Sequence, residues 1–483
     1  MLTISQLTEK LPPELLEKIL VYAPVPDILR MKQVNRDFHD FIQGSPYIKY
    51  RIDLFAVGLE ENPAVNLSLI DKRRAFDEHC TRWDVLNPIQ TWEREIGIHG
   101  YLQASGPGVY SFIADRKKFI QFLTLESVPR GIPQREWKLP LPDFVLAGFA
   151  INPHADALAL VERKENEYSI HLWSMKTGHP HPAAELPIIN WHKTDPTVAI
   201  YSASITGSRF AMLIALPAPN VAEMVVWDWR TGMNLLDRAD RWYQFLEFIN
   251  EHSFVVLSES WQGDPPQLHI FDTEQGTVLG SIQTSFAFST IHREVLLCLS
   301  SEPCGYVPSP DELTTAPFYS DPSQRILALR IGGYGWHGIS LELLLGFARE
   351  RQGQNIGWDE WRAYIIGVQT GKIRNFDYIW VSGCRLFCTV YDGTDDGGNA
   401  LYYLRIYDFS HAGRARYLRT LGRPSPNGPT KLISPRLYGY RLPWYCRHLR
   451  NATPTTGHDS IVFCVAPDPP SEPSTGILRV WSL

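Results

Sequence analysis

One short phrase recurs along most of this 483-residue chain and constrains its fold more than any other feature. Each copy has alternating apolar residues, then an aromatic or large apolar residue, often an Asp, and usually a Gly about five residues later. The copies are SIHLWSMKTG (169–178), MVVWDWRTG (224–232), QLHIFDTEQG (267–276), AYIIGVQTG (363–371), YLRIYDF (403–409) and GILRVWSL (476–483). Alternation with a period of two predicts β-strands, and Gly suits the turn that follows.

The spacing of these copies predicts a repeat architecture. Their anchor residues are Trp173, Trp227, Phe271, Ile366, Tyr407 and Trp481. The first two are 54 residues apart, the third follows after 44, and the fourth and fifth are 41 apart. The gap of 95 after the third can hold an unrecognised unit, around 325–331, and a fainter unit lies at 119–125. A period of about 40–45 residues with a strand-Trp-Asp signature is typical of β-propeller blades.

We therefore expect a β-propeller of about seven blades, with six or eight also possible. The last strand, 477–481, should complete the blade that begins near residue 100, because closing the ring removes exposed sheet edges. The phrase resembles degenerate WD-type repeats, although Trp227-Asp228 is the one literal Trp-Asp pair among its six copies and no Gly-His start is evident. The alternative is a generic all-β domain with recurrent hairpins.

The N-terminal segment 11–42 has a different, helical pattern. Pro12, Pro13 and Glu14 suit the first turn of a helix that Pro24 and Pro26 would end. The next two helices would be capped by Asp27 and by Asn35. A unit below about 40 residues has difficulty burying so many apolar side chains alone, so its apolar excess predicts a patch that docks on a partner.

This segment resembles the F-box. The matching positions are Leu11, Pro12, Glu14, Leu15, Leu16, Ile19, Leu20, Asp27, Ile28, Leu29, Met31, Val34, Asn35, Arg36 and Phe38. It departs from the family pattern at Ala23, where Leu is common, and at Arg51, where Trp is common. The resemblance covers about a tenth of the chain and implies docking on the Skp-type adaptor of an SCF ubiquitin ligase, and through it on a cullin–RING assembly. The alternative is an ordinary helical cap on a large domain.

The resemblance also implies which residues dock on the adaptor. They are Leu11, Pro12, Glu14, Leu15, Ile19, Leu20, Ile28, Leu29, Val34 and Phe38. The sequence leaves open which of them face the adaptor and which form the small helical core behind that surface.

The expected organisation is α plus mainly β. Residues 1–52 would form a three-helix F-box, and 53–97 a helical linker with a helix at about 67–92 that packs the F-box against the rest. Residues 98–483 would form the β-propeller-like substrate-binding domain. The combination, with Trp-Asp-Glu-Trp at 358–361, also resembles fungal F-box proteins of mushroom-forming lineages.

Composition excludes several classes of partner. With 46 basic and 52 acidic residues the formal charge is −6, which gives no broad field for nucleic acid or an anionic membrane. Seven scattered cysteines argue against a disulfide framework and fit a reducing compartment, the cytoplasm and/or the nucleus. No signal peptide is evident, and the longest apolar run, 341–348, is too short to cross a bilayer.

Three motifs that resemble catalytic or metal sites have simpler explanations. Gly333–Gly338 has the spacing of a dinucleotide loop, but such a loop needs a following helix, and 339–345 suits a strand at least as well. Asp392–Gly398 resembles part of a calcium loop, but Tyr403 occupies the position of the required Glu, so a hairpin turn is expected. Cys384 and Cys388 have no second zinc-spaced pair and are expected to be core thiols on one strand face.

We therefore expect no catalytic residue, no cofactor and no metal site. The leading hypothesis is a non-catalytic substrate receptor of an SCF-type ligase whose target is an unidentified protein. The alternatives are a propeller scaffold without a ligase role, and an enzyme with an unrecognised site in the β domain.

Overall fold

The computed structural model describes most of the chain in defined segments. The described residues are 12–85, 90–97, 103–106, 108–114, 118–125, 133–164, 167–192, 199–216, 221–259, 267–283, 296–299, 317–331, 335–357, 360, 365–367, 376–394, 400–413, 436–441, 455–456, 460–465 and 475–482.

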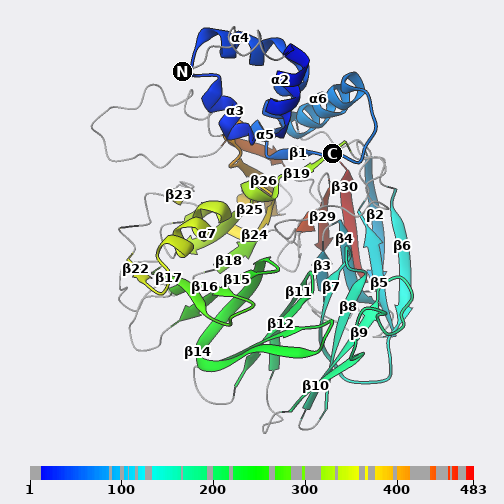
Figure 1. Ribbon diagram of the computed structural model, residues 1–483. Coiled ribbons are helices and arrows are strands. Elements are labelled where there is room, and N and C mark those ends of the chain that lie inside the picture. Colours follow the sequence, from blue (N-terminus) through cyan, green and yellow to red (C-terminus); the bar gives the residue numbers. More distant parts are fainter. Residues whose placement is uncertain are drawn as a thin grey trace.

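Four short helices form a unit at one end of the molecule (Figure 1). They are α2 (Pro13–Tyr22), α3 (Val25–Met31), α4 (Arg36–Gly44) and α5 (Pro46–Ala56). Asn35 caps α4 as predicted, because its side chain accepts a hydrogen bond from the Phe38 amide at 2.8 Å. The predicted cap at Asp27 is wrong. Pro24 is the N-cap of α3, and Asp27 lies inside the first turn, where its charge suits the helix dipole.

A strand and a longer helix connect this unit to the β region. They are β1 (Leu59–Glu61) and α6 (Leu69–Val85), the latter within the expected helix at 67–92. The next strand, β2 (Gln90–Gly97), lies in the span expected to be linker, so the β region begins at Gln90 and not at residue 98.

Beyond the linker the described strands form seven four-stranded antiparallel units. Five are separate sheets, and two share an eight-stranded sheet through the long strand β14. Blade 1 contains β3 (Gln103–Gly106), β4 (Val109–Ala114), β5 (Phe119–Thr124) and β6 (Arg135–Pro140). Blade 2 contains β7 (Leu146–Asn152), β8 (Ala157–Arg163), β9 (Glu167–Ser174) and β10 (Ile188–His192). Blade 3 contains β11 (Ala199–Thr206), β12 (Arg209–Ala215), β13 (Ala222–Asp228) and the first half of β14 (Met233–Asn250).

The remaining blades follow the same order. Blade 4 contains the second half of β14, β15 (Ser253–Glu259), β16 (Gln267–Asp272) and β17 (Val278–Gln283), with β22 (Asn355–Ile356) added in parallel at its edge. Blade 5 contains β18 (Leu296–Leu299), β20 (Ile326–Ile331), β21 (Gly335–Ser340) and β23 (Ile365–Gly367). Blade 6 contains β24 (Phe376–Ser382), β25 (Arg385–Thr394), β26 (Ala400–Asp408) and β27 (Arg436–Arg441). Blade 7 contains β28 (Thr455–Thr456), β29 (Ser460–Val465), β30 (Thr475–Ser482) and β2.

The first strands of the blades contact one another in chain order, which arranges the blades around an axis. β3 contacts β7, β7 contacts β11, β11 contacts β14, and in the second half β18 contacts β24 and β24 contacts β28. This arrangement, with seven four-stranded blades, is a β-propeller, as expected.

The ring closes differently from the expectation. Blade 1 has four strands without the C-terminal strand, and β30 instead pairs with β2 from Gln90↔Ser482 to Gly97↔Thr475. Figure 1 shows β2 in blue beside β30 in red. The segment expected to be linker therefore supplies the outermost strand of the last blade, and closure still removes a free edge.

Five of the six anchors occupy one structural position. Trp173, Trp227, Phe271, Tyr407 and Trp481 all lie on the third strand of their blade. The turn after that strand also repeats. Asp228 and Asp272 each accept hydrogen bonds from two following amides, and their carbonyls accept from the amides of Gly232 (2.8 Å) and Gly276 (3.0 Å). Both glycines have positive φ, which explains their place in the repeated phrase.

Blade 5 departs from this pattern. Its third strand is β21, and Ile366 lies on the fourth strand, while the segment suspected at 325–331 contains the second. No Gly turn follows β21, because Ser340 caps the helix α7 (Leu341–Glu350), which packs on β17 and β21. The segment 339–345, which suited a strand at least as well as a helix, thus divides between the end of β21 and α7.

A small sheet joins the helical unit to the propeller. β1 pairs antiparallel with β19 (Phe318–Ser320), which the 3-10 helix η2 (Pro322–Gln324) follows. Buried Phe318 packs with Tyr50, Leu54 and Phe76 from the two flanking helices, α5 and α6. The Gln324 side chain donates to the Phe55 carbonyl at 2.7 Å. The helical unit is therefore packed on the propeller and not merely tethered to it.

Candidate functional site

The helical unit has a small core of its own. The buried side chains that cluster there are Leu16, Leu20, Ile28, Phe38, Ile42 and Ile48, all below 6% exposed. They come from α2, α3, α4 and α5, so each of the four helices contributes to the core. Burying one such side chain stabilises a fold by about 1.5–3 kcal/mol, which explains why the short helices hold together.

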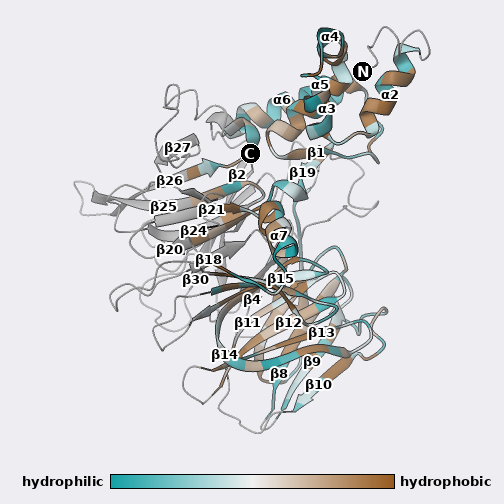
Figure 2. Cartoon of the chain, turned by 60° about the vertical axis from the view of Figure 1, so that its left-hand side comes forward, coloured by the Kyte–Doolittle hydropathy of each residue, from teal (hydrophilic) through white to brown (hydrophobic). Residues whose placement is uncertain are grey.

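One face of α2 remains exposed and apolar. Leu15, Ile19 and Tyr22 are 46%, 54% and 89% exposed, and their spacing places them on one side of the helix. We call these three residues the α2 outer face. Figure 2 shows α2 at the end of the molecule that is farthest from the propeller blades. Large exposed apolar side chains gathered on one helix face are typical of a protein-docking surface.

The structure divides the ten residues predicted to dock on an adaptor. Leu20, Ile28 and Phe38 are buried in the helical core. Leu29 is half-buried, and Leu11 lies outside the described residues. The exposed members are Pro12, Glu14, Leu15, Ile19 and Val34. Tyr22 was not among the predicted residues. Its position three residues after Ile19 places it on the same helix face and could have indicated it.

Arg51, which departs from the family pattern, holds the C-terminus of α2. Its guanidinium donates to the carbonyls of Leu20 and Ala23 at 3.4 Å each, and to that of Val21 over a shorter distance. The last carbonyls of a helix lack intrahelical partners and carry partial negative charge, so a cation there is favourable. Arg51 therefore fixes α2 on α5 and with it the direction of the α2 outer face.

Helix α5 itself was not predicted from the sequence. Its signal is Ser45-Pro46, a capping residue followed by Pro in the first turn. The Ser45 hydroxyl accepts from the Ile48 amide at 3.1 Å and donates to Glu17 on α2. Ser45 thus starts α5 and ties it to α2 at the same time.

A charged cluster ties α5 to the linker. The Glu61 carboxylate accepts from the Tyr47 hydroxyl and pairs with Lys72 at 2.8 Å, both ion-pair side chains being about one-eighth exposed. Burial, and then the Glu61 carboxylate, raise the pKa of Tyr47 far above its ordinary value, so the phenol remains a donor. On β19, burial and then Glu60 raise the pKa of Tyr319 to about 12.

Comparison with known proteins identifies the helical unit. A family model described as F-box-like matches residues 8–54. Residues 8–54 form an F-box-like domain. This confirms the resemblance seen in the sequence. The domain contains α2, α3, α4 and most of α5, and the α2 outer face lies on it.

One curated relative and several solved structures are similar to this chain. An F-box protein of Arabidopsis thaliana is 24% identical over 153 residues, which cover 30% of this chain and 37% of that protein. The chain thus spans 37% of the length of this relative. The β-propeller domain of Cps50 (Swd1) from Myceliophthora thermophila shares 10% identity, covers 81% of this chain and 100% of that one, and has a TM-score of 0.43. The WD40 domain of coronin from Toxoplasma gondii shares 10% identity, covers 82% and 87%, and has a TM-score of 0.36.

The motifs that resemble catalytic or metal sites lie in strands and turns. Of Gly333–Gly338, the described residues 335–338 belong to β21, and buried Gly338 lies against the ring of Phe409. Asp392 lies on β25, which pairs with β26 as a hairpin, and 395–399 are outside the described residues. Buried Cys384 is in the turn between β24 and β25, so the prediction that it shares a strand face with Cys388 is wrong.

Among the described residues, no group of three or more His, Cys, Asp or Glu side chains could hold a metal ion. Within the same residues, no helix has the length and apolar character needed to cross a membrane.

Proposed function

We propose that this protein is the substrate-recognition subunit of an SCF-type ubiquitin ligase. Its F-box-like domain would dock on a Skp-type adaptor, which links to a cullin and a RING protein, and its propeller would bind the target. The observation that carries this proposal is the α2 outer face, which is exposed and apolar on a domain matched by the F-box-like family model. The resemblance in the sequence supplies the adaptor as the partner.

The proposed role needs no covalent chemistry from this chain. A receptor that holds the target near the ubiquitin thioester raises the effective concentration of a target lysine there. The packed junction at β1 and β19 supports this role, because it holds the adaptor-docking end at a fixed place relative to the propeller. We place the complex in the cytoplasm or the nucleus, the compartments that the cysteine content favours.

Co-purification with a Skp-type adaptor tests the proposal. We expect wild type to retain the adaptor at micromolar concentration, and the double variant Leu15→Ala, Ile19→Ala to lose most of it, because two apolar contacts disappear without changing the core. Leu343→Ala is the control, since Leu343 is similarly exposed (48%) but lies on α7. Absence of retention by wild type would contradict the ligase role, and equal retention by the double variant would contradict the role of the α2 outer face.

A further inference from the structure

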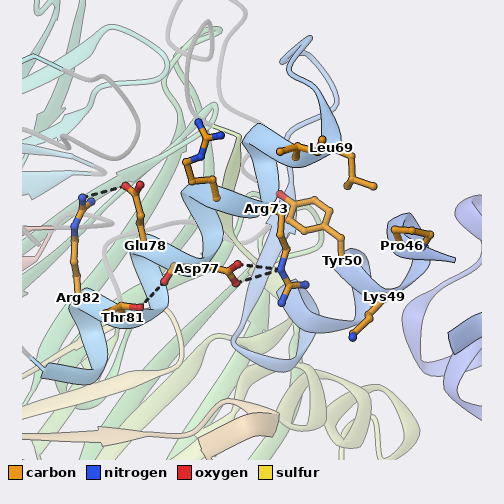
Figure 3. A pocket seen from close by; sticks show the side chains of 11 residues that line it. Pro46, Lys49, Tyr50, Leu69, Arg73, Asp77, Glu78, Thr81 and Arg82 are labelled. Carbon is orange, nitrogen blue, oxygen red and sulfur yellow. Dashed lines mark hydrogen bonds and ion pairs between the residues drawn. The ribbon is translucent and has the colours of Figure 1, made fainter. Parts of the chain in front are cut away.

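The propeller has a polar pocket of its own, smaller than the groove that α5 and α6 form (Figure 3). In that groove carboxylates lie among the cations, and Arg73 pairs with Asp77 at 3.1 Å and Arg82 with Glu78 at 3.2 Å. The propeller pocket lies where blade 4 meets the last strand of blade 3, and its volume is about 230 Å³. Pockets for drug-sized ligands hold roughly 300–1,000 Å³, so this one suits a group of amino-acid side-chain size.

An insert in blade 5 builds one wall of the pocket. After β21 the chain forms α7, which packs on β17 of blade 4, and then returns as β22 along the edge of the same blade. The Gly353 amide donates to the Leu279 carbonyl at 3.2 Å, and Asn355 pairs with Ser281 in parallel register. Residues 353–355 line the pocket and are exposed, so this wall forms its mouth. The segment that breaks the repeat in blade 5 thus encloses a polar space beside blade 4.

Arg238 is the only Lys, Arg, Asp or Glu among the described residues that line the pocket. It comes from the half of β14 that belongs to blade 3, and its guanidinium carbon lies 5.7 Å from the centre of the Phe271 ring in blade 4. Outside the lining, the Asp240 carboxylate accepts from Nη2 of Arg238 at 2.6 Å and also from the Tyr243 hydroxyl. The hydrogen bond to Asp240 raises the pKa of Arg238, so the guanidinium stays charged. A guanidinium has five N–H donors and can serve a second acceptor on the pocket side.

A chain of three hydrogen-bonded side chains ends at the pocket. His269 is 4% exposed, and its Nε2 lies 2.7 Å from the Ser258 hydroxyl oxygen, while its Nδ1 lies 2.7 Å from that of Ser281. Ser281 is half-buried and lines the pocket. In the neutral tautomer with hydrogen on Nδ1, Ser258 donates to His269, His269 donates to Ser281, and Ser281 donates into the pocket. The chain thereby presents a hydroxyl donor at the pocket without adding a buried charge.

We propose that this pocket binds a carboxylate carried by a group of side-chain size. The Arg238 guanidinium supplies the positive charge, and the Ser281 hydroxyl supplies a donor from the buried side. The side chains of Gln267 and Asn355 add amide donors. Two sources share this chemistry, a small free acid and an acidic residue of a protein. The inference does not depend on the ligase role, because every group that carries it lies on blades 3 and 4 or on the insert from blade 5.

Titration calorimetry of the full chain with matched probes tests this proposal. Succinate and succinamide have the same carbon skeleton, but only succinate is charged, so we expect succinate to bind and succinamide not to bind. Two tripeptides with both ends capped, Gly-Glu-Gly and Gly-Gln-Gly, separate the two sources. Tighter binding of Gly-Glu-Gly than of succinate assigns the pocket to an acidic residue of a protein, and the reverse assigns it to a small free acid.

Three variants connect the binding to the groups named above. Arg238→Gln should weaken succinate binding at least about tenfold, and Ser281→Ala about fivefold, because each loses a hydrogen bond to a charged group. Asp240→Asn should strengthen it, because the acceptor that competes for the guanidinium loses its charge. A gain in affinity cannot come from unfolding, so Asp240→Asn keeps the test decisive even if Arg238→Gln fails to fold. Lys176→Gln, which removes an exposed cation from blade 2, is the control and should match wild type.

The outcomes separate this inference from the proposed function. If wild type binds neither succinate nor Gly-Glu-Gly, or binds the uncharged probes equally well, the proposal is overturned. A folded Arg238→Gln variant that binds like wild type overturns it too. Failure of wild type to retain the adaptor in the co-purification test contradicts the ligase role and leaves the pocket unaffected.

Discussion

At the residue scale, Arg51 departs from the family pattern and has a structural role in this fold. Arg51 stands where the family often has Trp, and no pattern around it indicates a role for its side chain. In the fold its guanidinium lies against three carbonyls at the end of α2. Such contacts between residues 28 to 31 positions apart depend on how two helices pack, so helical periodicity alone could not predict them.

We expect Arg51→Met to loosen α2 while leaving the propeller intact. A hydrogen bond from a charged group contributes about 1.5–3 kcal/mol, so amide exchange in α2 should become at least about tenfold faster. Hydrogen exchange by mass spectrometry checks this. Arg36→Met is the matched control, because the Arg36 side chain is 91% exposed and makes one long contact with Asp40. Equal exchange in the two variants would contradict the capping role.

At the scale of elements, the repeated phrase predicts blades well where the third strand ends in the common turn. Trp173, Trp227 and Phe271 mark blades 2, 3 and 4 because a Ser or Asp and a Gly form that turn after each. In blade 5 the phrase was assigned to Ile366, which lies on the fourth strand, because α7 follows the third strand in place of the common turn. The strand β2 was not predicted because its partner, β30, is nearly 400 positions away in the chain. A local sequence pattern carries no information about such pairing.

Gly338 on β21 offers a test of how blades 5 and 6 pack. A Cβ at this position would overlap the ring of buried Phe409, so Gly338→Ala should destabilise the fold by about 1–3 kcal/mol. Gly346→Ala is the contrasting variant, since nothing lies within 4 Å of its Cβ position and Ala favours the helix α7 by about 0.5–1 kcal/mol. The melting temperatures of the two variants should therefore shift in opposite directions. A Gly338→Ala melting temperature at or above that of wild type would contradict the close packing of Gly338 on Phe409.

At the scale of the whole molecule, the junction between the helical unit and the propeller determines whether the adaptor-docking end and the target-binding propeller move as one rigid body. β1 pairs with β19, and the turn residue Gly58 lies against Cys384 of blade 6. On α6, the Trp83 ring is covered by the Arg385 guanidinium at 4.2 Å. Contacts from blades 5 and 6 thus fix the F-box-like domain and the linker helix on one side of the ring.

Gly58→Ala should weaken this junction for two reasons. Its φ is +79°, and the new Cβ would lie 2.7 Å from the Cys384 sulfur. Adding Cys384→Ala should relieve the steric part but not the backbone part, so the two changes should be non-additive in a double-mutant cycle. Limited proteolysis between the helical unit and the propeller measures the effect. Strict additivity would show that Gly58 and Cys384 do not interact as described.

The most direct test of the central claim is hydrogen exchange of the full chain with and without a Skp-type adaptor. We expect bound adaptor to slow exchange in α2, at 13–22, while the blades far from the helical unit stay unchanged. An adaptor complex that leaves α2 unprotected, or protects only the propeller, would contradict the account.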